Sequence, residues 1–309
     1  MTVTEKGRSK TVPTLHFEAS LQGSQYDATM VIGKKASLEA LLPKLLNELG
    51  VTTVAKAAVD AMIDAIDEKT GGGPSSTLVV TGEGADKAAA HHLQVAGLPS
   101  KLSRHNHPMA VHTLTSLACK AVPKGSARSR LVVLTDDFSV GPLGMAVAKA
   151  FPLFSMKTGG AAETPPKELH IGFYSASGNF VTDPNMLQAA KIAAKGAQLT
   201  ARLVDSHPEL LTTTQFSNEV QELVAQQYAH KVTMTEIVGK DLDAKGYGGL
   251  YGVGKAANCP PRLVILEYDG SPAPGEKVET VALVGKGIVF DTGGLALKVR
   301  CCDMNNRGE

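Results

Sequence analysis

The side chains best suited to chemistry lie in one segment near the C-terminus, Val284–Lys298. An apolar strand there carries Lys286, and Asp291 follows at its far end, before a Thr-Gly-Gly turn. A buried lysine and carboxylate are costly unless they pair or bind a metal ion. They are five positions apart, so both reach one ion only if the strand bends or ends between them. Spacing alone leaves two readings open, and it favours an ion pair over a metal site because a lysine ligand must first lose its proton.

A second glycine-rich segment, Gly249–Ala256, has the spacing of a phosphate-binding loop, with glycines followed by Lys255. However, Ala256 stands where a hydroxyl group should bind magnesium. No hydrophobic strand directly precedes the loop, and Pro260-Pro261 follow where a helix is needed. A tight glycine-rich turn that packs against a neighbour is therefore the better interpretation.

The histidines and cysteines give weaker signals. His91-His92 fall on a helical pattern, but their spacing matches no standard zinc arrangement, so surface or interdomain histidines are expected. Cys301-Cys302 are adjacent, which is poor geometry for one metal and strained for a disulfide. The four cysteines suggest no disulfide framework, and a reducing, cytoplasmic setting is expected.

Composition limits the classes of function. Hydrophobic residues make up 43% and charged residues 20%, as in soluble globular proteins, and 309 residues are enough for two domains. The net charge of +1 leaves no large basic field for nucleic acid. No apolar run approaches the roughly 18 residues of a membrane span, and the N-terminus lacks the apolar core of a signal peptide. We expect no nucleic-acid partner and no membrane association.

The elements that must position these side chains follow from periodicity. The first 175 residues alternate strand-type and helix-type patterns, which predicts an α/β architecture with helices covering a sheet. The expected strands are Thr14–Glu18, Ala28–Ile32, Thr77–Thr81, Arg130–Thr135 and Glu168–Tyr174. The expected helices are Ser37–Leu49 and Pro142–Ala150.

A long helix is expected next, with Asp183 as its N-cap and Pro184 at its first position. A second helix begins at Thr212 with a capping box. The strands expected after it are Thr233–Val238, Leu263–Tyr268 and Thr280–Phe290. Each parallel crossover unit needs about 30 residues, so this second α/β region looks incomplete.

These segments resemble the leucyl aminopeptidase family, M17. Val284–Lys298 is similar to the family signature, a glycine-lysine-glycine strand leading to Phe-Asp-[Ser/Thr]-Gly-Gly and then a second lysine. Gly246–Lys255 followed by Pro260–Tyr268 is similar to its glycine loop, Pro-Pro and strand. The Gly-Val-Gly-Lys-Ala-Ala stretch at 252–257 resembles the "probable aminopeptidase" branch of the family. Ala201–Asp205 and Thr212–Phe216 resemble its interdomain helix and the turn after it.

The resemblance implies a specific chemistry. Such enzymes remove N-terminal residues from peptides with two divalent metal ions, Mn2+ or Zn2+, and assemble as hexamers. By position, Lys286 would be a neutral-amine metal ligand and Asp291 a carboxylate ligand. Lys298 would remain an ammonium and stabilise the oxyanion of the tetrahedral intermediate. Peptide substrates and a homo-oligomer are the implied partners.

The match stops after Lys298. The family continues to further carboxylate ligands and an arginine, but Val299–Glu309 resemble neither. This break indicates a truncated or alternatively spliced product, or a mispredicted gene model, and we expect little or no activity from the chain alone. The alternative is a non-catalytic truncated subunit that assembles with or modulates the full-length aminopeptidase.

The expected domains follow from this comparison. An N-terminal α/β domain with a mixed sheet and flanking helices covers residues 1–180, and an interdomain helix covers 181–207. An incomplete α/β metallopeptidase catalytic domain covers 208–309, with 299–309 as a divergent tail.

Overall fold

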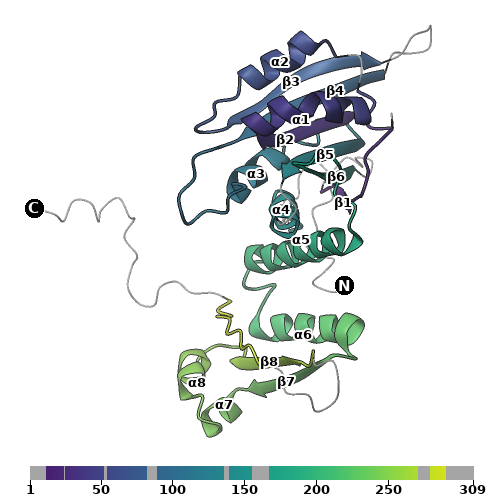
Figure 1. The fold of residues 1–309 in the computed structure, drawn as a ribbon. Coiled ribbons are helices and arrows are strands. Elements are labelled where there is room, and N and C mark those ends of the chain that lie inside the picture. The colour runs from purple at the N-terminus through teal and green to yellow at the C-terminus, as the bar shows by residue number, and fades with distance from the viewer. Residues whose placement is uncertain are drawn as a thin grey trace, which may run out of the picture. The chain divides into compact units, whose positions relative to one another are not determined.

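A computed structural model describes residues 12–23, 25–51, 54–81, 89–135, 139–154, 167–270 and 279–289 of the chain. The chain divides into two compact units at the boundary between Asp205 and Ser206 (Figure 1). In the described ranges, no helix is both long enough and apolar enough to cross a membrane.

The first unit is built around a six-stranded sheet. Its strands are β1 (Thr14–Phe17), β2 (Ala28–Lys34), β3 (Gly72–Thr81), β4 (Ala89–Leu98), β5 (Arg128–Thr135) and β6 (Glu168–Ser175). Its helices are α1 (Lys35–Glu48), α2 (Lys56–Asp64), α3 (Val111–Ala118), α4 (Val140–Lys149) and α5 (Pro184–Asp205).

The sheet is mixed, as expected. The strand order is β1-β6-β5-β2-β4-β3, and all neighbours run parallel apart from β3, which is antiparallel to β4 at the edge. Strands β2 and β5 are buried along nearly their whole length. Parallel strands covered on both faces carry continuous apolar runs of this kind. The predicted α/β class is confirmed.

Helices cover both faces of this sheet. On one face, α1 and α2 pack side chains such as Leu42 and Met62 against Val31 and Val132. On the other, α3, α4 and α5 pack against the alternate strand residues, such as Leu131. The period of two along each strand therefore divides the apolar residues between two cores.

Helix α5 packs closely on α4. The Asp183 carboxylate accepts a hydrogen bond from the Asn185 backbone N–H at 2.8 Å, and Pro184 takes the first helical position. Gly144 of α4 faces Ala190 of α5, where a Cβ at position 144 would lie 2.9 Å from both the Cβ and the carbonyl oxygen of Ala190. Glycine is needed here because no side chain fits between the helices.

The second unit is smaller. Its elements are α6 (Thr213–Leu223), the π-helix η1 (Val224–Tyr228), β7 (Val232–Val238), α7 (Lys240–Ala244), α8 (Gly248–Gly254) and β8 (Arg262–Tyr268). The Thr212 hydroxyl accepts from the Gln215 backbone N–H, which caps α6 as predicted. Strands β7 and β8 form an antiparallel pair in which Val232 faces Tyr268 and Val238 faces Arg262.

Two expectations about elements are wrong. The sequence predicts a strand over Thr280–Phe290, but the described residues 279–289 contain none. A strand must pair its backbone N–H and C=O groups, and no described residue pairs with this segment. His91-His92 lie in strand β4 rather than on a helix. Pairing with β2 on one side and β3 on the other outweighs the local helical pattern.

Candidate functional site

Lys286 is the only one of the three predicted site residues that lies in the described ranges. It is part of the segment 279–289, in which residues 279–288 are exposed and Val289 is half-buried. An amine binds a metal only after losing its proton, and burial beside a dication favours that loss. The exposed position gives Lys286 no such surroundings.

Asp291 and Lys298, the other predicted site residues, lie outside the described residues. The described ranges also contain no group of three or more His, Cys, Asp or Glu side chains that could hold a metal ion. A divalent ion needs several such donors around it. The described residues therefore do not fit a metal pair by themselves.

The glycine-rich segment before β8 is helical. Gly248–Gly254 forms α8, and the element before it is the helix α7 rather than the strand that a phosphate-binding loop requires. Gly254 packs against Pro261, because a Cβ at position 254 would lie 2.4 Å from the Pro261 Cβ. The packing interpretation of this segment fits the structure, and the nucleotide-binding interpretation does not.

The Pro260-Pro261 pair fixes the start of β8. The Thr213 hydroxyl donates to the Pro260 carbonyl at 2.9 Å, and the Gly239 N–H donates to the Pro261 carbonyl at 2.9 Å. These bonds join the start of α6, the end of β7 and the start of β8. They set the position of β8, the last described strand before the predicted metal-binding segment.

A charged pair ties the same elements together. Arg262 Nη1 donates to Glu236 Oε1 at 2.7 Å, and the Ser217 hydroxyl donates to the same oxygen. Arg262 Nη2 also donates to the Thr214 hydroxyl at 3.2 Å. Partial burial raises the pKa of Glu236, but the hydrogen bonds from Ser217 and Arg262 outweigh it, so the pKa is lowered overall. The Arg262–Glu236 pair therefore holds α6, β7 and β8 together.

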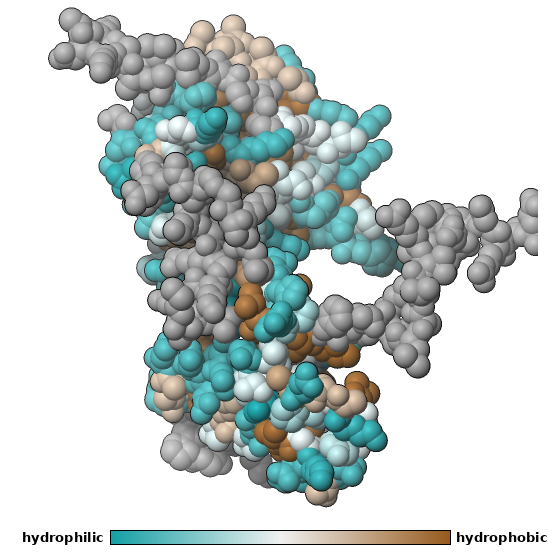
Figure 2. Space-filling model, turned by 180° about the vertical axis from the view of Figure 1, so that it is seen from behind, coloured by the Kyte–Doolittle hydropathy of each residue, from teal (hydrophilic) through white to brown (hydrophobic). Residues whose placement is uncertain are grey.

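Apolar side chains of the second unit reach the surface. Figure 2 shows brown, hydrophobic atoms at the surface of this unit, in the lower part of the view. Leu266 of β8 is 50% exposed, and in the segment 279–289 Leu283 is 93% and Val284 98% exposed. A run such as Leu263–Leu266 is typical of a strand covered on both faces. Within the described ranges, the two faces of β8 are only partly covered by other residues.

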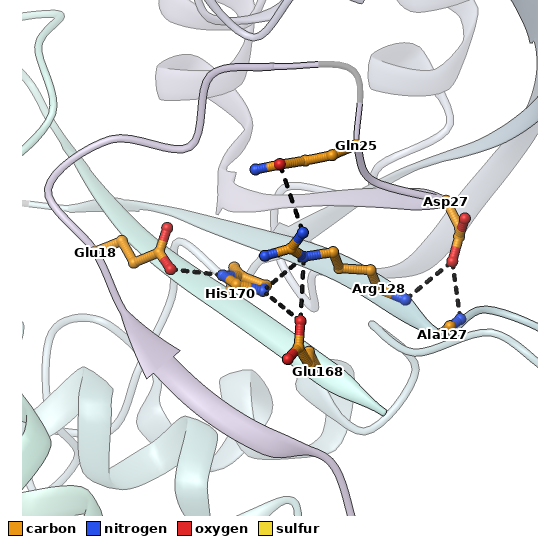
Figure 3. Close-up of polar contacts among 7 residues, drawn as sticks. All are labelled: Glu18, Gln25, Asp27, Ala127, Arg128, Glu168 and His170. Atoms are coloured by element: carbon orange, nitrogen blue, oxygen red, sulfur yellow. Dashed lines mark hydrogen bonds and ion pairs between the residues drawn. The ribbon is translucent and has the colours of Figure 1, made fainter. Parts of the chain in front are cut away.

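A second polar assembly lies in the first unit, at the amino ends of β5 and β6 (Figure 3). We call Glu18, Arg128, Glu168 and His170 the His170 cluster. His170 is 4% exposed, and its Nδ1 lies 2.6 Å from Glu18 Oε1. Its Nε2 lies 3.2 Å from Arg128 Nε and 3.3 Å from Glu168 Oε2. Arg128 Nε is in turn 3.1 Å from Glu168 Oε2, so three charged or ionisable groups meet at one point.

Arg130 lies beside this cluster and is 1% exposed. Its Nε donates to the Thr29 hydroxyl at 2.6 Å, and its Nη1 donates to the Leu21 carbonyl at 2.7 Å. The guanidinium carbon lies 4.9 Å from the centre of the Tyr26 ring. Burial lowers the pKa of Arg130 to about 10, so the group is charged at neutral pH. This cation ties Leu21 and Tyr26 to the sheet, through a carbonyl oxygen and a ring.

His91 is joined to Arg130 through the Thr29 hydroxyl group. Its Nδ1 lies 2.7 Å from the Tyr26 carbonyl, and its Nε2 lies 2.8 Å from the Thr29 hydroxyl oxygen. Because a carbonyl can only accept, Nδ1 carries the proton and Nε2 accepts from Thr29. Burial is the main cause of a lowered pKa at His91. The hydrogen bond to the Tyr26 carbonyl opposes that shift, and the charge of Arg130 adds to it. The expectation of surface or interdomain histidines is wrong at His91, which is buried in the first unit.

A sequence signal for this cluster exists. Strand β5 begins with Arg128 and Arg130, and β6 begins with Glu168 and His170, each pair two positions apart and so on one face of its strand. The parallel register then sets Arg130 beside His170. The alternation of residues along a strand shows which side chains share a face. Only the order of the strands in the sheet shows which side chains of different strands are neighbours.

Comparisons with known proteins agree with this architecture. The model of the "Cytosol aminopeptidase family, catalytic domain" matches residues 198–307, and that of the "M17 aminopeptidase N-terminal domain 2" matches residues 28–160. The mouse (Mus musculus) "Probable aminopeptidase NPEPL1" is 38% identical over 205 residues, covering 66% of this chain and 38% of the relative. "Leucine aminopeptidase 1" of Caenorhabditis elegans is 32% identical over 213 residues, covering 68% of this chain and 40% of the relative.

Solved structures share the fold. An M17 aminopeptidase from Trypanosoma brucei superposes with a TM-score of 0.71 at 30% identity, covering 96% of this chain and 55% of that one. Leucyl aminopeptidase from Leishmania major, solved in complex with actinonin, gives 0.72 at 26% identity, covering 98% and 55%. The chain thus spans about half the length of the structures that it matches. The N-terminal-domain match and the catalytic-domain match together show that this chain belongs to the cytosol (leucyl) aminopeptidase family, M17.

Proposed function

We propose that this protein is a metal-dependent aminopeptidase that releases N-terminal amino acids from peptides, as leucyl aminopeptidases do. The observation that carries the proposal is the catalytic-domain match over residues 198–307, which includes Lys286, Asp291 and Lys298. The described elements α6, β7 and β8 precede that segment in the chain.

Two divalent metal ions, Mn2+ or Zn2+, are the proposed cofactors, and Lys286 and Asp291 are their proposed ligands. Bound dications would supply Lewis acidity at the scissile carbonyl. Lys286 serves only if the exposed segment 279–289 becomes buried, since burial beside a dication favours the neutral amine. Lys298, as an ammonium, is proposed to stabilise negative charge that develops on the substrate carbonyl oxygen.

We also propose that these 309 residues have little or no peptidase activity on their own. Lys286 and Asp291 are too few donors to hold two ions. The second candidate function is that of a non-catalytic subunit that assembles with or modulates a complete aminopeptidase chain. The exposed apolar side chains of β8 and the segment 279–289, such as Leu266 and Leu283, favour it.

The test is isothermal titration of the purified chain with Mn2+ and Zn2+, together with hydrolysis of a leucyl substrate, on the wild type and Asp291→Ala. Weak metal uptake and negligible hydrolysis support the proposal for the isolated chain. Tight, stoichiometric uptake that Asp291→Ala abolishes would show that a usable site forms despite the few donors. Robust metal-dependent release of leucine by the chain alone would overturn the proposed inactivity.

We also propose that the protein acts on peptide substrates, assembles as a homohexamer and lies in the cytoplasm. Relatives named cytosol aminopeptidase support the location. Light scattering on the purified chain, with and without a complete family chain, tests the assembly. Strict monomer behaviour in both mixtures would count against the subunit role.

A further inference from the structure

Strand β7 has one edge with which no described strand pairs. Its sheet consists of β7 and β8 alone, and their register runs without a break from the Val232–Tyr268 pair to the Val238–Arg262 pair (Figure 1). β7 contains neither a proline nor a bulge, which are two of the features that protect exposed strand edges from further pairing. Within the described ranges, the outer edge of β7 is therefore open to another strand.

The hydrogen-bond pattern shows which backbone groups of β7 face this open edge. The Gly239 N–H donates to the Pro261 carbonyl at 2.9 Å, and this pair continues the register of β7 and β8. In an antiparallel pair, every second residue exchanges its backbone hydrogen bonds with the neighbouring strand. Thr235, four positions before Gly239, therefore bonds to β8, whereas Met234 and Glu236 direct their N–H and C=O groups toward the open edge.

A cleft lies beside β7, on the side of the helical segment that precedes it. Its volume is about 240 Å³, and it is lined by Gln221 of α6, Val224 and Ala225 of η1, and Met234 and Glu236 of β7. Pockets for whole small molecules are larger, roughly 300–1,000 Å³, so this cleft suits a single side chain. Val224 and Ala225 begin the π-helix, and π-helical turns are rare and frequently lie at functional sites.

The cleft combines apolar surface with one free carboxylate oxygen. Val224 and Met234 supply the apolar surface. Arg262 and Ser217 both bind Oε1 of Glu236, so Oε2 has no partner among the described residues. Partial burial alone would raise the pKa of Glu236, but the bonds at Oε1 lower it overall, and the carboxylate is ionised at neutral pH. A lysine side chain matches this cleft, because its methylene stem lies on apolar surface while its ammonium group reaches Oε2.

We propose that β7 binds an extended peptide along its open edge, with a lysine side chain of that peptide in the cleft beside Glu236. Main-chain hydrogen bonds to Met234 and Glu236 supply the affinity, and the cleft supplies the preference for a basic side chain. The site is separate in sequence from the segment that carries Lys286. The inference goes beyond the proposed peptidase activity, because it concerns binding alone and holds whether or not this chain hydrolyses peptides.

The test is an NMR titration of the 15N-labelled 309-residue chain with the peptide acetyl-Thr-Val-Lys-Val-Thr-amide, whose blocked N-terminus resists an aminopeptidase. Binding should slow hydrogen exchange at the Met234 and Glu236 amides and leave the Thr235 amide, which already bonds to β8, unchanged. The same peptide with norleucine in place of lysine keeps the stem without the charge and should bind about tenfold more weakly.

Three outcomes would overturn the proposal. The first is equal affinity of the two peptides, and the second is equal protection of all three amides. The third is protection of Met234 and Glu236 that appears without peptide and grows with protein concentration, which would assign the open edge to a second copy of this chain.

Two leucine substitutions separate the cleft from the rest of the helical segment. Ala225→Leu fills the cleft while the Arg262–Glu236 pair stays in place, and it should abolish the preference for lysine over norleucine. Ala229→Leu, at an exposed position just after η1 and outside the cleft lining, is the matched control and should keep that preference. Loss of the preference in both variants, or in neither, refutes the site. If Ala225→Leu does not fold, the protection of Met234 and Glu236 in the wild type decides.

Discussion

Arg262 and Glu236 form a diagonal ion pair across the two strands of the second unit, with 2.7 Å between Arg262 Nη1 and Glu236 Oε1. The Ser217 hydroxyl of α6 donates to the same carboxylate oxygen. One carboxylate thus ties α6, β7 and β8 together. This arrangement fixes the start of β8 against α6 and β7.

Glu236→Gln is expected to lower the free energy of unfolding by about 1 kcal/mol at pH 7, because it removes the charge from a partly exposed pair. The pKa of Glu236 is lowered from 4.5, so the stability it confers is present above pH 4.5 and is lost as pH falls through the lowered value. Urea unfolding followed by circular dichroism at pH 7 and pH 3 measures this. Glu267→Gln, at an exposed position of β8, is the control, and an equal loss in both variants would contradict the role of the pair.

Gly254→Ala is expected to destabilise the second unit by about 1–3 kcal/mol, because the new Cβ would lie 2.4 Å from the Pro261 Cβ. Gly252→Ala, in the same helix with nothing within 4 Å of its Cβ, is the matched control. The midpoint of urea unfolding separates the two. Equal stability of both variants would show that α8 does not pack on Pro261.

Gly144→Ala tests the contact between α4 and α5. Its Cβ would lie 2.9 Å from the Ala190 carbonyl oxygen, so a loss of about 1–3 kcal/mol in the first unit is expected. Gly141→Ala in the same helix has open space and should be neutral or stabilising by up to about 1 kcal/mol. Thermal unfolding of the full chain distinguishes them, and a neutral Gly144→Ala would argue against close packing of these helices.

The pH dependence of the first unit should depend on His91. Its pKa is lowered from 6.5, chiefly by burial, so the folded state resists a proton that the unfolded state accepts. Stability is therefore complete above pH 6.5 and falls as pH drops below it. His91→Gln should flatten this fall between pH 7 and pH 5, whereas His112→Gln, at an exposed position, should not. An unchanged slope in His91→Gln would contradict the assignment.

The elements of the fold were largely predictable because their signals are local. Caps at Asp183 and Thr212 and apolar runs such as Arg130–Thr135 depend on neighbouring residues, and they occur where expected. Strand β4 was missed because its state depends on pairing with β2 and β3 rather than on its own periodicity. The prediction of a strand over Thr280–Phe290 was wrong because apolar residues alone do not make a strand. The described part of this segment is apolar, but no described strand pairs with it.

The sequence by itself determined the α/β class and the order of the family motifs that carry Lys286, Asp291 and Lys298. Both are properties of residue order, which needs no knowledge of distant contacts. Only the tertiary structure decided that Lys286 lies in an exposed segment and that His170, Arg128 and Glu18 meet. Strand periodicity fixes which face a side chain occupies. Its neighbours on that face depend on the order β1-β6-β5-β2, which brings together residues far apart in the chain.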